Sequence, residues 1–161
     1  MVVFSEAGLE AVGIKTAVSN QEKIQYLKRF LTLDREIDRK LKEVEHWRAR
    51  LGRVTAIYSF EPKGGGSIQG KTENAIVKIV DLENEINADI DRLIEIRGDI
   101  KAVIEAVEDD RERILLQYRY IDGKTFEWIA EQMNYSSRQA HRLHSQSLAN
   151  LKIKDVIECH T

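Results

Sequence analysis

Two long stretches of this chain carry apolar residues at a seven-residue repeat, with a glycine triplet between them. The first stretch runs from about residue 21 to 58 and the second from about residue 72 to 107. Repeats this long predict two helices, each roughly 50–55 Å in length, that pack along their sides. Pro62 and the triplet of Gly64, Gly65 and Gly66 disfavour helix, so we expect a turn at 59–71 and an antiparallel hairpin.

The repeat assigns ten inward positions to each stretch. In the first they are Leu27, Phe30, Asp34, Ile37, Leu41, Val44, Arg48, Leu51, Thr55 and Tyr58. In the second they are Ile76, Ile79, Glu83, Ile86, Ile90, Leu93, Arg97, Ile100, Ile104 and Val107. Most of these residues are apolar, as a buried seam requires.

Four charged residues interrupt the two seams in a complementary way. Folding the chain back at the glycine triplet places Asp34 opposite Arg97 and Arg48 opposite Glu83. Both pairs have opposite sign in a single antiparallel register. Because an ion pair removed from water contributes little net stability, we expect the two pairs to fix the register rather than to stabilise the hairpin.

Additional apolar residues flank both seams. They are Leu31, Leu33, Trp47 and Val54 on the first stretch, and Val80, Ile94, Ile96 and Val103 on the second. A stripe of this width exceeds what a two-helix hairpin covers. The surplus must meet another surface, and we expect a homodimer formed through the hairpin.

Composition supports a soluble, all-helical, cytoplasmic protein. The chain has 161 residues, of which 42% are apolar and 32% charged, with nine Gly, one Pro and one Cys. The single Cys159 excludes an internal disulfide framework, and no apolar run reaches the ~20 residues that span a bilayer. Residues 1–110 carry 17 basic against 21 acidic side chains, whereas residues 111–154 carry 8 against 4. A nucleic-acid partner is therefore compatible with the C-terminal part.

One segment matches a nucleotide-binding pattern. Residues 65–72 read GGSIQGKT, which satisfies G-x-x-x-x-G-K-T. That motif binds phosphate only between a buried strand and a helix in a parallel sheet, and the sequence offers no strands to build one. We interpret it as a loop, and neither a cofactor nor a nucleotide-hydrolysing activity is expected.

The C-terminal third predicts three helices in close succession. Asp109 and Asp110 open the first, and Thr125 precedes a short helix from Phe126 to Met133. Asn134 lies where a tight turn needs a positive φ, and Ser136 with Gln139 forms a capping box for a helix from about residue 137 to 151. This spacing is typical of a helix-turn-helix, whose second helix enters the DNA major groove.

The last helix separates into two faces. Ala140, Leu143, Ser147, Leu148 and Leu151 form its inner side. The opposite side has no acidic residue and supplies the candidate DNA-binding residues Ser137, Arg138, Gln139, His141, Arg142, Ser145 and Gln146. Lys124 and Lys152 are candidates for phosphate contacts, and His141 and His144 for phosphate contact or titration near neutrality. Arg111 and Arg113 are further basic residues, although helix-surface charges are usually only solvated.

These residues resemble a known family. The segments RERILL, YRY, TFEWIAEQM, SSRQ and LANLK between residues 111 and 152 are similar to region 4 of bacterial sigma-70 factors. Residues 22–153 as a whole resemble ArpU/RinA-type late transcription regulators of phages and prophages. The resemblance implies binding to double-stranded DNA and contact with RNA polymerase, with Ser137, Arg138, His141 and Arg142 facing the DNA. Asn134 replaces the usual Gly of the turn, and Ser137 and His141 replace frequent arginines, so base preference is not carried over.

The sequence therefore predicts an all-α protein with four parts. These are an arm at 1–20, a long antiparallel helical hairpin at 21–107, a sigma-region-4-like helix-turn-helix at 108–154 and a tail at 155–161. We expect a non-enzymatic DNA-binding regulator without metal, since His141, His144, Cys159 and His160 lack the spacing of a zinc site. The alternative is a structural or adaptor protein that uses the hairpin for assembly.

Overall fold

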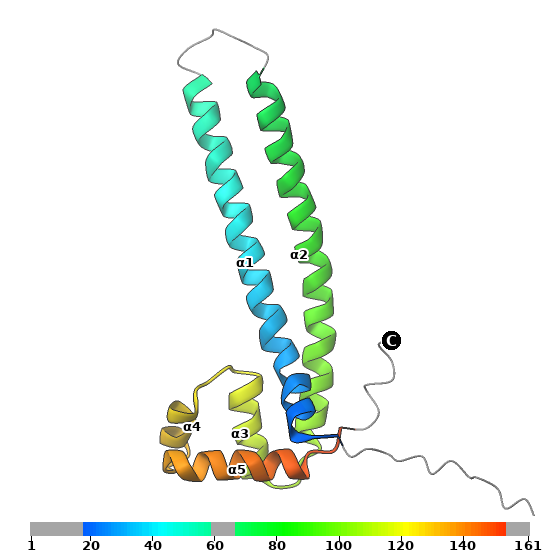
Figure 1. Cartoon of the computed structure of the whole chain (residues 1–161), viewed down its shortest axis with the longest axis vertical. Helices are drawn as coiled ribbons and strands as arrows, with labels where there is room; N and C mark the ends of the chain where they lie inside the picture. The colour runs from blue at the N-terminus through cyan, green and yellow to red at the C-terminus, as the bar shows by residue number, and fades with distance from the viewer. Residues whose placement is uncertain (1–17, 59–66, 154–161) are drawn as a thin grey trace, which may run out of the picture.

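The chain folds as a long helical hairpin with a small three-helix head at one end (Figure 1). The structure is a computed structural model that describes residues 18–58 and 67–153. It confirms the predicted all-α class, because the described residues contain helices and no strand. Residues 1–17 of the expected arm, the glycine triplet and the tail with Cys159 and His160 lie outside the described residues. Within the described part, no helix combines the length and apolar character needed to cross a membrane.

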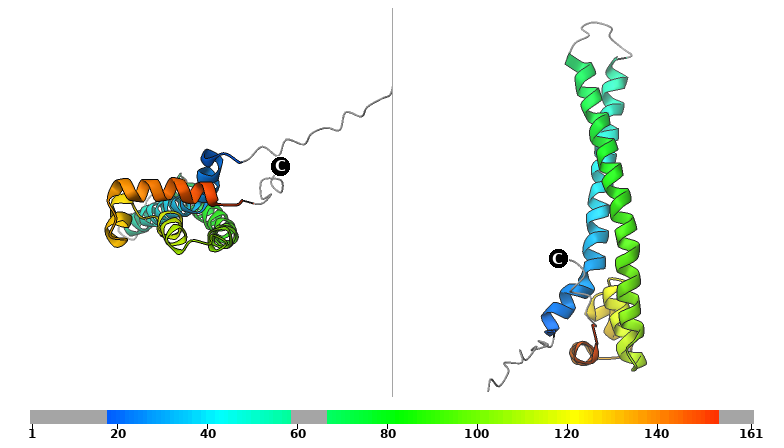
Figure 2. Two further views of the ribbon diagram at one scale, coloured as in Figure 1. Left: turned by 90° about the horizontal axis from the view of Figure 1, so that it is seen from below. Right: turned by 90° about the vertical axis from the view of Figure 1, so that its right-hand side faces the viewer.

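The hairpin consists of α1 (Asn20–Tyr58) and α2 (Ser67–Glu105), each 39 residues long. They run antiparallel side by side (Figures 1 and 2). α1 begins at a reciprocal cap, in which the Ser19 amide donates to Glu22 Oε2 at 2.7 Å and the Glu22 amide donates to Ser19 Oγ at 3.3 Å. α2 begins five residues earlier than predicted, because one glycine (Gly70) costs a helix only about 1 kcal/mol.

Half of the predicted seam is confirmed. Phe30, Ile37 and Val44 of α1 are buried, as are Ile79, Ile86 and Ile100 of α2. These residues form the central line of contact between the two helices. They recur every seven residues, as the sequence repeat predicts.

Along the other predicted line, Leu27 and Ile104 are buried as expected, but the positions between them are wrong by one residue on both helices. Leu41, Ile76 and Ile90 were expected inside but are 45%, 48% and 39% exposed. The buried apolar side chains on this line lie one position before the predicted ones. They are Leu33 before Asp34, Ala75 before Ile76, Leu82 before Glu83 and Ile96 before Arg97. On a helix the neighbours at i+3 and i+4 both flank the central line. Burying Leu33 and half-burying Trp47, in place of Asp34 and Arg48, removes more apolar surface from water.

This rotation changes which charges lie between the helices. Lys40 Nζ lies 2.7 Å from Asp89 Oδ2 and 3.0 Å from Glu85 Oε2, and the Lys40 and Asp89 side chains are each only 21% exposed. Arg48 and Glu83 do meet, with Nη2 and Oε1 2.5 Å apart, but at a more exposed edge. The described residues contain no Asp34–Arg97 ion pair, because the Arg97 guanidinium lies over the Phe30 ring, 5.8 Å from its centroid.

The head comprises α3 (Asp110–Tyr120), α4 (Phe126–Gln132) and α5 (Ser137–Asn150). α5 lies across the end of the hairpin and is the foremost helix when the molecule is viewed from below (Figure 2). A single apolar cluster joins head and hairpin, and it includes Leu27 and Ile100 together with Leu116, Tyr120 and Leu148. Lys23 of α1 also donates from Nζ to the Leu148 carbonyl at 2.7 Å. The head is therefore fixed to the base of the hairpin rather than tethered to it.

Candidate nucleic-acid interface

Local sequence signals determine where α5 starts. Asn134 adopts φ 55°, the left-handed conformation that the turn requires and that Asn tolerates better than most residues. Ser136 then caps the helix: its amide donates to Gln139 Oε1 at 2.8 Å, and the Gln139 amide donates back to Ser136 Oγ at 3.3 Å. Both predicted features of the turn are confirmed.

The inner side of α5 is anchored in the head. Ala140, Ser147 and Leu148 are buried, and Leu151 is buried just beyond the helix end. Ser147 satisfies its hydroxyl by donating to the Leu143 carbonyl at 2.7 Å. Because this side is held by α3, α4 and α1, the opposite side faces solvent at the end of the molecule.

The solvent-facing side of α5 contains every DNA-binding residue predicted on this helix. All seven are exposed: Ser137, Arg138, Gln139, His141, Arg142, Ser145 and Gln146. Arg138 and Arg142 form no ion pair within the described residues, so their guanidinium groups are available to an external acceptor. In contrast, Gln139 Oε1 is occupied by the cap, and Ser145 Oγ donates to the His141 carbonyl at 3.2 Å.

The formally charged side chains of α5 are all positive. The helix holds two arginines and no acidic residue, and its N-terminal turn adds the positive end of the helix dipole. The acidic residues that precede α5 most closely in sequence, Glu127 and Glu131, belong to α4. An exposed helix with this charge favours a polyanion over an acidic or neutral partner.

The two histidines of α5 have different surroundings. His141 is exposed, and its ring packs on Phe126 with centroids 4.2 Å apart. His144 is turned inward, where its Nε2 lies 2.8 Å from Tyr120 Oη and its ring stacks on Tyr120. Burial, followed by the positive charge of Arg119, lowers the pKa of His144 to about 4. The prediction that His144 titrates near neutrality is therefore wrong.

Tyr120 is the partner that keeps His144 in place. Burial raises the pKa of Tyr120 to about 12, so its hydroxyl retains its proton. The neutral hydroxyl and the neutral His144 ring share a hydrogen bond between Tyr120 Oη and His144 Nε2. This contact joins α3 to the inner side of α5 and orients the helix that carries the exposed residues.

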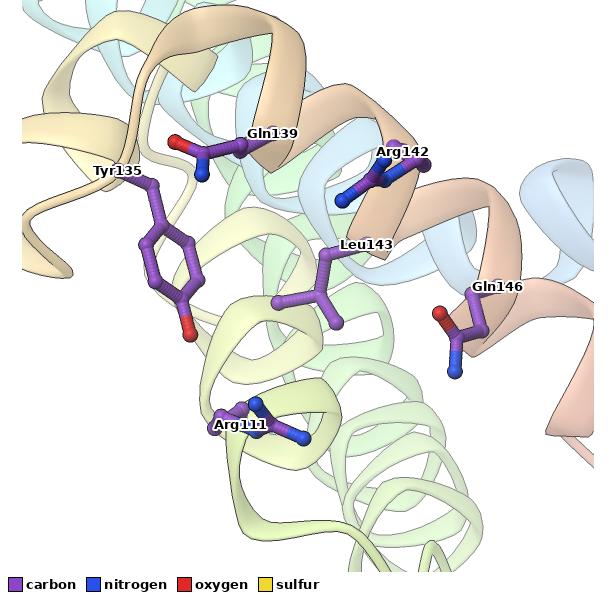
Figure 3. A pocket seen from close by; sticks show the side chains of 6 residues that line it. All are labelled: Arg111, Tyr135, Gln139, Arg142, Leu143 and Gln146. Carbon is purple, nitrogen blue, oxygen red and sulfur yellow. The ribbon is translucent and has the colours of Figure 1, made fainter.

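A hollow of about 240 Å³ lies between α5 and the start of α3 (Figure 3). It is lined by Arg111, Tyr135, Gln139, Arg142, Leu143 and Gln146. Arg111 and Arg142 enter it from different helices, and the Tyr135 ring points toward Arg111. Tyr135 is not among the predicted site residues. Its position directly before the capping Ser136, at the start of α5, is the one sequence feature that indicates it.

Arg111 is held in position by an acidic neighbour. Its Nη2 lies 3.0 Å from Asp109 Oδ2, yet the Arg111 side chain remains 66% exposed. Hydrogen bonds from the Arg111 side chain and backbone lower the pKa of Asp109 to about 2, so the carboxylate stays charged near neutrality. Arg113, in contrast, donates to the Val107 carbonyl at 2.9 Å and pairs with Asp110, which assigns it to the α2–α3 junction.

The two predicted phosphate-binding lysines lie outside α5 itself. Lys124 follows α3, where its Nζ lies 5.0 Å from the centroid of the Trp128 ring. Trp128 itself packs edge-on against Tyr118, as a structural residue does. Lys152 follows the end of α5 and is exposed.

A buried carboxylate ties the end of α5 to the start of α3. Glu112 is 1% exposed, and Asn150 Nδ2 donates to both of its carboxylate oxygens at 3.0 Å. Nothing in the sequence pattern indicated this pair, because the two residues are 38 positions apart. Together with the Tyr120–His144 contact, it holds α5 near both of its ends.

Comparison with known families agrees with this geometry. Residues 109–152 match the family model described as Sigma-70, region 4. No curated protein and no solved structure matches the chain. The matched residues coincide with the head. Sigma-70 region 4 is a DNA-binding helix-turn-helix domain, which supports a DNA-binding regulator.

Proposed function

We propose that this protein is a sequence-specific regulator of transcription that reads the major groove with α5. The observation that carries the proposal is the exposed side of α5, where Arg138 and Arg142 lie without an acidic residue while the opposite side is buried. A guanidinium matches the two acceptors on a guanine edge, and Ser and Gln side chains hydrogen-bond other base edges. The similarity to sigma-70 region 4 supports the same placement.

The hollow beside α5 suits a phosphate of the DNA backbone. Arg111 and Arg142 line it from two helices, and Tyr135 adds a hydroxyl. Contacts of this kind set the orientation of a recognition helix without reading sequence. We assign Arg138 to base recognition and Arg111 with Arg142 to positioning on the duplex.

We further propose that the regulated genes belong to a phage or prophage, that RNA polymerase is a second partner, and that the chain acts as a homodimer through its hairpin. The resemblance to ArpU/RinA-type regulators supports the first point, and the sigma-70 region 4 match supports the second. Apolar side chains left exposed on α2 support the third. Binding of the purified chain to purified bacterial core RNA polymerase, with and without promoter DNA, tests the polymerase contact.

Selection of random duplexes by the purified full chain tests DNA recognition. We expect a short consensus, and an affinity for it that falls steeply as salt rises, because phosphate contacts release counterions. The variant Arg138→Ala/Arg142→Ala should lose the consensus, whereas Arg39→Ala, at an exposed position on α1, should keep it. If no duplex is retained at low salt, the protein is instead an adaptor that uses the hairpin for assembly.

A further inference from the structure

The described residues expose large apolar side chains mainly along one helix. Seven such residues are exposed, and five of them lie on α2: Ile76, Val77, Val80, Ile90 and Ile94. Ile94 is 66% exposed, the highest fraction of the five. Large apolar side chains that are exposed together typically mark an interaction surface. Four of the five fall on one line of the helix, which we call the outer column: residues 73, 76, 80, 83, 87, 90, 94 and 97. The outer column lies beside the line that α2 buries against α1.

The outer column is complementary to itself around its midpoint at residue 85. Ile76 and Ile94 lie equally far from the midpoint, and so do Val80 and Ile90. Next to the midpoint, Glu83 and Asn87 form a polar pair, and at the two ends Glu73 and Arg97 form a pair of opposite charge. A surface that meets an identical surface across a two-fold axis needs this kind of self-complementarity.

We propose that the outer column binds the outer column of a second copy in antiparallel orientation. Ile76 of one copy then lies opposite Ile94 of the other, and Val80 lies opposite Ile90. Leu41 of α1, 45% exposed at the level of Ile90, widens the apolar contact. The two hairpins together form a four-helix bundle that covers the side chains the single hairpin leaves in water.

Charge selects the antiparallel orientation over the parallel one. In the antiparallel pair, Arg97 faces Glu73, and both side chains are exposed in the single chain. Glu83 of one copy faces Asn87 of the other, and the Asn87 amide can donate to the Glu83 carboxylate. Within its own chain, Glu83 Oε1 lies 2.5 Å from Arg48 Nη2. A parallel pair would place each of these charges against its own copy, and such like-charge contacts oppose association.

The orientation determines what the dimer does with DNA, and this step rests on the proposed function. Each head starts about 20 residues beyond the midpoint of α2, so the two heads begin about 60 Å apart, at opposite ends of the bundle. α5 is the outermost helix at its end (Figure 2). The dimer therefore holds two duplex segments at once, which joins distant sites or separate molecules.

Charge reversal tests the pairing. The dissociation constant of the dimer, measured by analytical ultracentrifugation, should rise roughly 2–30-fold in Arg97→Glu or Glu73→Arg, because two pairs are lost in each dimer. The double variant Glu73→Arg/Arg97→Glu should recover most of this loss. Lys78→Glu, an exposed reversal outside the outer column, should leave the constant unchanged. A wild-type chain that stays monomeric, or a double variant that recovers nothing, overturns the proposal.

Cysteine cross-linking tests the orientation. In a Cys159→Ser background, chains with Ile76→Cys and chains with Ile94→Cys should form a disulfide when mixed and none when oxidised alone. Cross-linking of the Ile94→Cys chain to itself would show a parallel dimer and overturn the proposal. Circular dichroism of each variant checks that the helices are retained.

Duplex bridging separates this inference from the proposed function. An immobilised duplex of the selected sequence should retain a second, fluorescent duplex only when the dimer is present. Ile94→Glu should abolish bridging and still bind one duplex with the wild-type affinity per head. If the wild-type chain binds no duplex, the proposed function is overturned, and the dimer is still tested by ultracentrifugation and cross-linking. If it binds single duplexes but does not bridge them, only this inference is overturned.

Discussion

Tyr120 Oη lies 2.8 Å from His144 Nε2, which makes a buried, neutral histidine part of the support for α5. The pKa of His144 is lowered from 6.5 to about 4, so the unfolded chain binds this proton more readily than the folded one. Stability from this group is complete above about pH 6.5 and declines as the pH falls toward 4. The decline is at most 1.36 kcal/mol per pH unit for one proton.

The first prediction is that this acid-dependent loss of stability disappears in His144→Phe, which keeps a ring against Tyr120 and cannot be protonated. Unfolding by denaturant at several pH values between 4 and 7 measures the slope. His46→Phe, at an exposed position on α1, should leave the slope unchanged. NMR titration of the His144 ring should give a midpoint near 4, and a midpoint near 6.5 would contradict the structure.

A second prediction concerns the buried carboxylate of Glu112. Asn150→Ala removes its hydrogen-bond donor and should destabilise the head by about 1–3 kcal/mol, because a charged group stays buried without its partner. Asn150→Asp should cost more, since it sets a second carboxylate against the first. Thermal unfolding measures both, and Ala149→Ser, at the exposed neighbouring position, is the control. Equal stability of the Asp and Ala variants would show that Asn150 does not hold the Glu112 side chain in the fold.

The contrast between these contacts and the turn shows what the sequence could predict. Ser136 and Gln139, which form the capping box, are only three residues apart, and the positive φ of Asn134 is a property of that residue alone. The start of α5 can therefore be predicted from a short segment of sequence. Tyr120 and His144 lie 24 residues apart, and their contact depends on how α3 crosses α5. No local pattern reports that crossing, and His144 was consequently placed with the titrating residues.

The hairpin shows the same division. A seven-residue repeat locates the central line through Ile37 and Ile86, since this line is apolar in every turn. It does not decide which flanking line turns inward, because Leu33 and Leu41 are both apolar and one residue of rotation separates the two choices. The decision depends on the summed burial along both helices and on the shielded Lys40–Asp89 pair, which involves residues 49 positions apart.

A third prediction compares the two ion pairs of the hairpin. Hydrogen bonds from Lys40 to Asp89 and Glu85 raise the pKa of Lys40, and the Lys40 and Asp89 side chains are mostly shielded from water. Arg48 and Glu83 are 63% and 41% exposed, and such pairs are typically worth ~0.2–1 kcal/mol. Double-mutant cycles should therefore give a larger coupling for Lys40–Asp89 than for Arg48–Glu83. The exchange Arg48→Glu/Glu83→Arg should recover what either change loses. Equal couplings would place both pairs in the same environment and contradict the observed rotation.

A fourth prediction tests the two turns of the head. Gly123 has φ 66°, and a Cβ there would lie 3.3 Å from Leu31 Cδ2, so Gly123→Ala combines backbone strain with a close contact against α1. We expect a loss of about 1–2 kcal/mol. Asn134→Gly should be neutral or slightly stabilising, because Gly adopts the same positive φ without a side chain. Chemical unfolding measures both, and an unaffected Gly123→Ala would show that this turn does not hold the head against the hairpin.

A fifth prediction separates base recognition from backbone binding. Arg138→Ala should cost about 1–3 kcal/mol on the selected duplex and relax preference at one position, because its guanidinium is exposed at the start of α5. Lys152→Ala should weaken binding to all duplexes alike and reduce the salt dependence, as the loss of a phosphate contact does. Affinities for the selected duplex and for single-base variants, each measured at several salt concentrations, distinguish the two effects. A uniform loss in Arg138→Ala would move this residue from the bases to the phosphate backbone and leave the groove to be read by other exposed side chains of α5, such as Gln146.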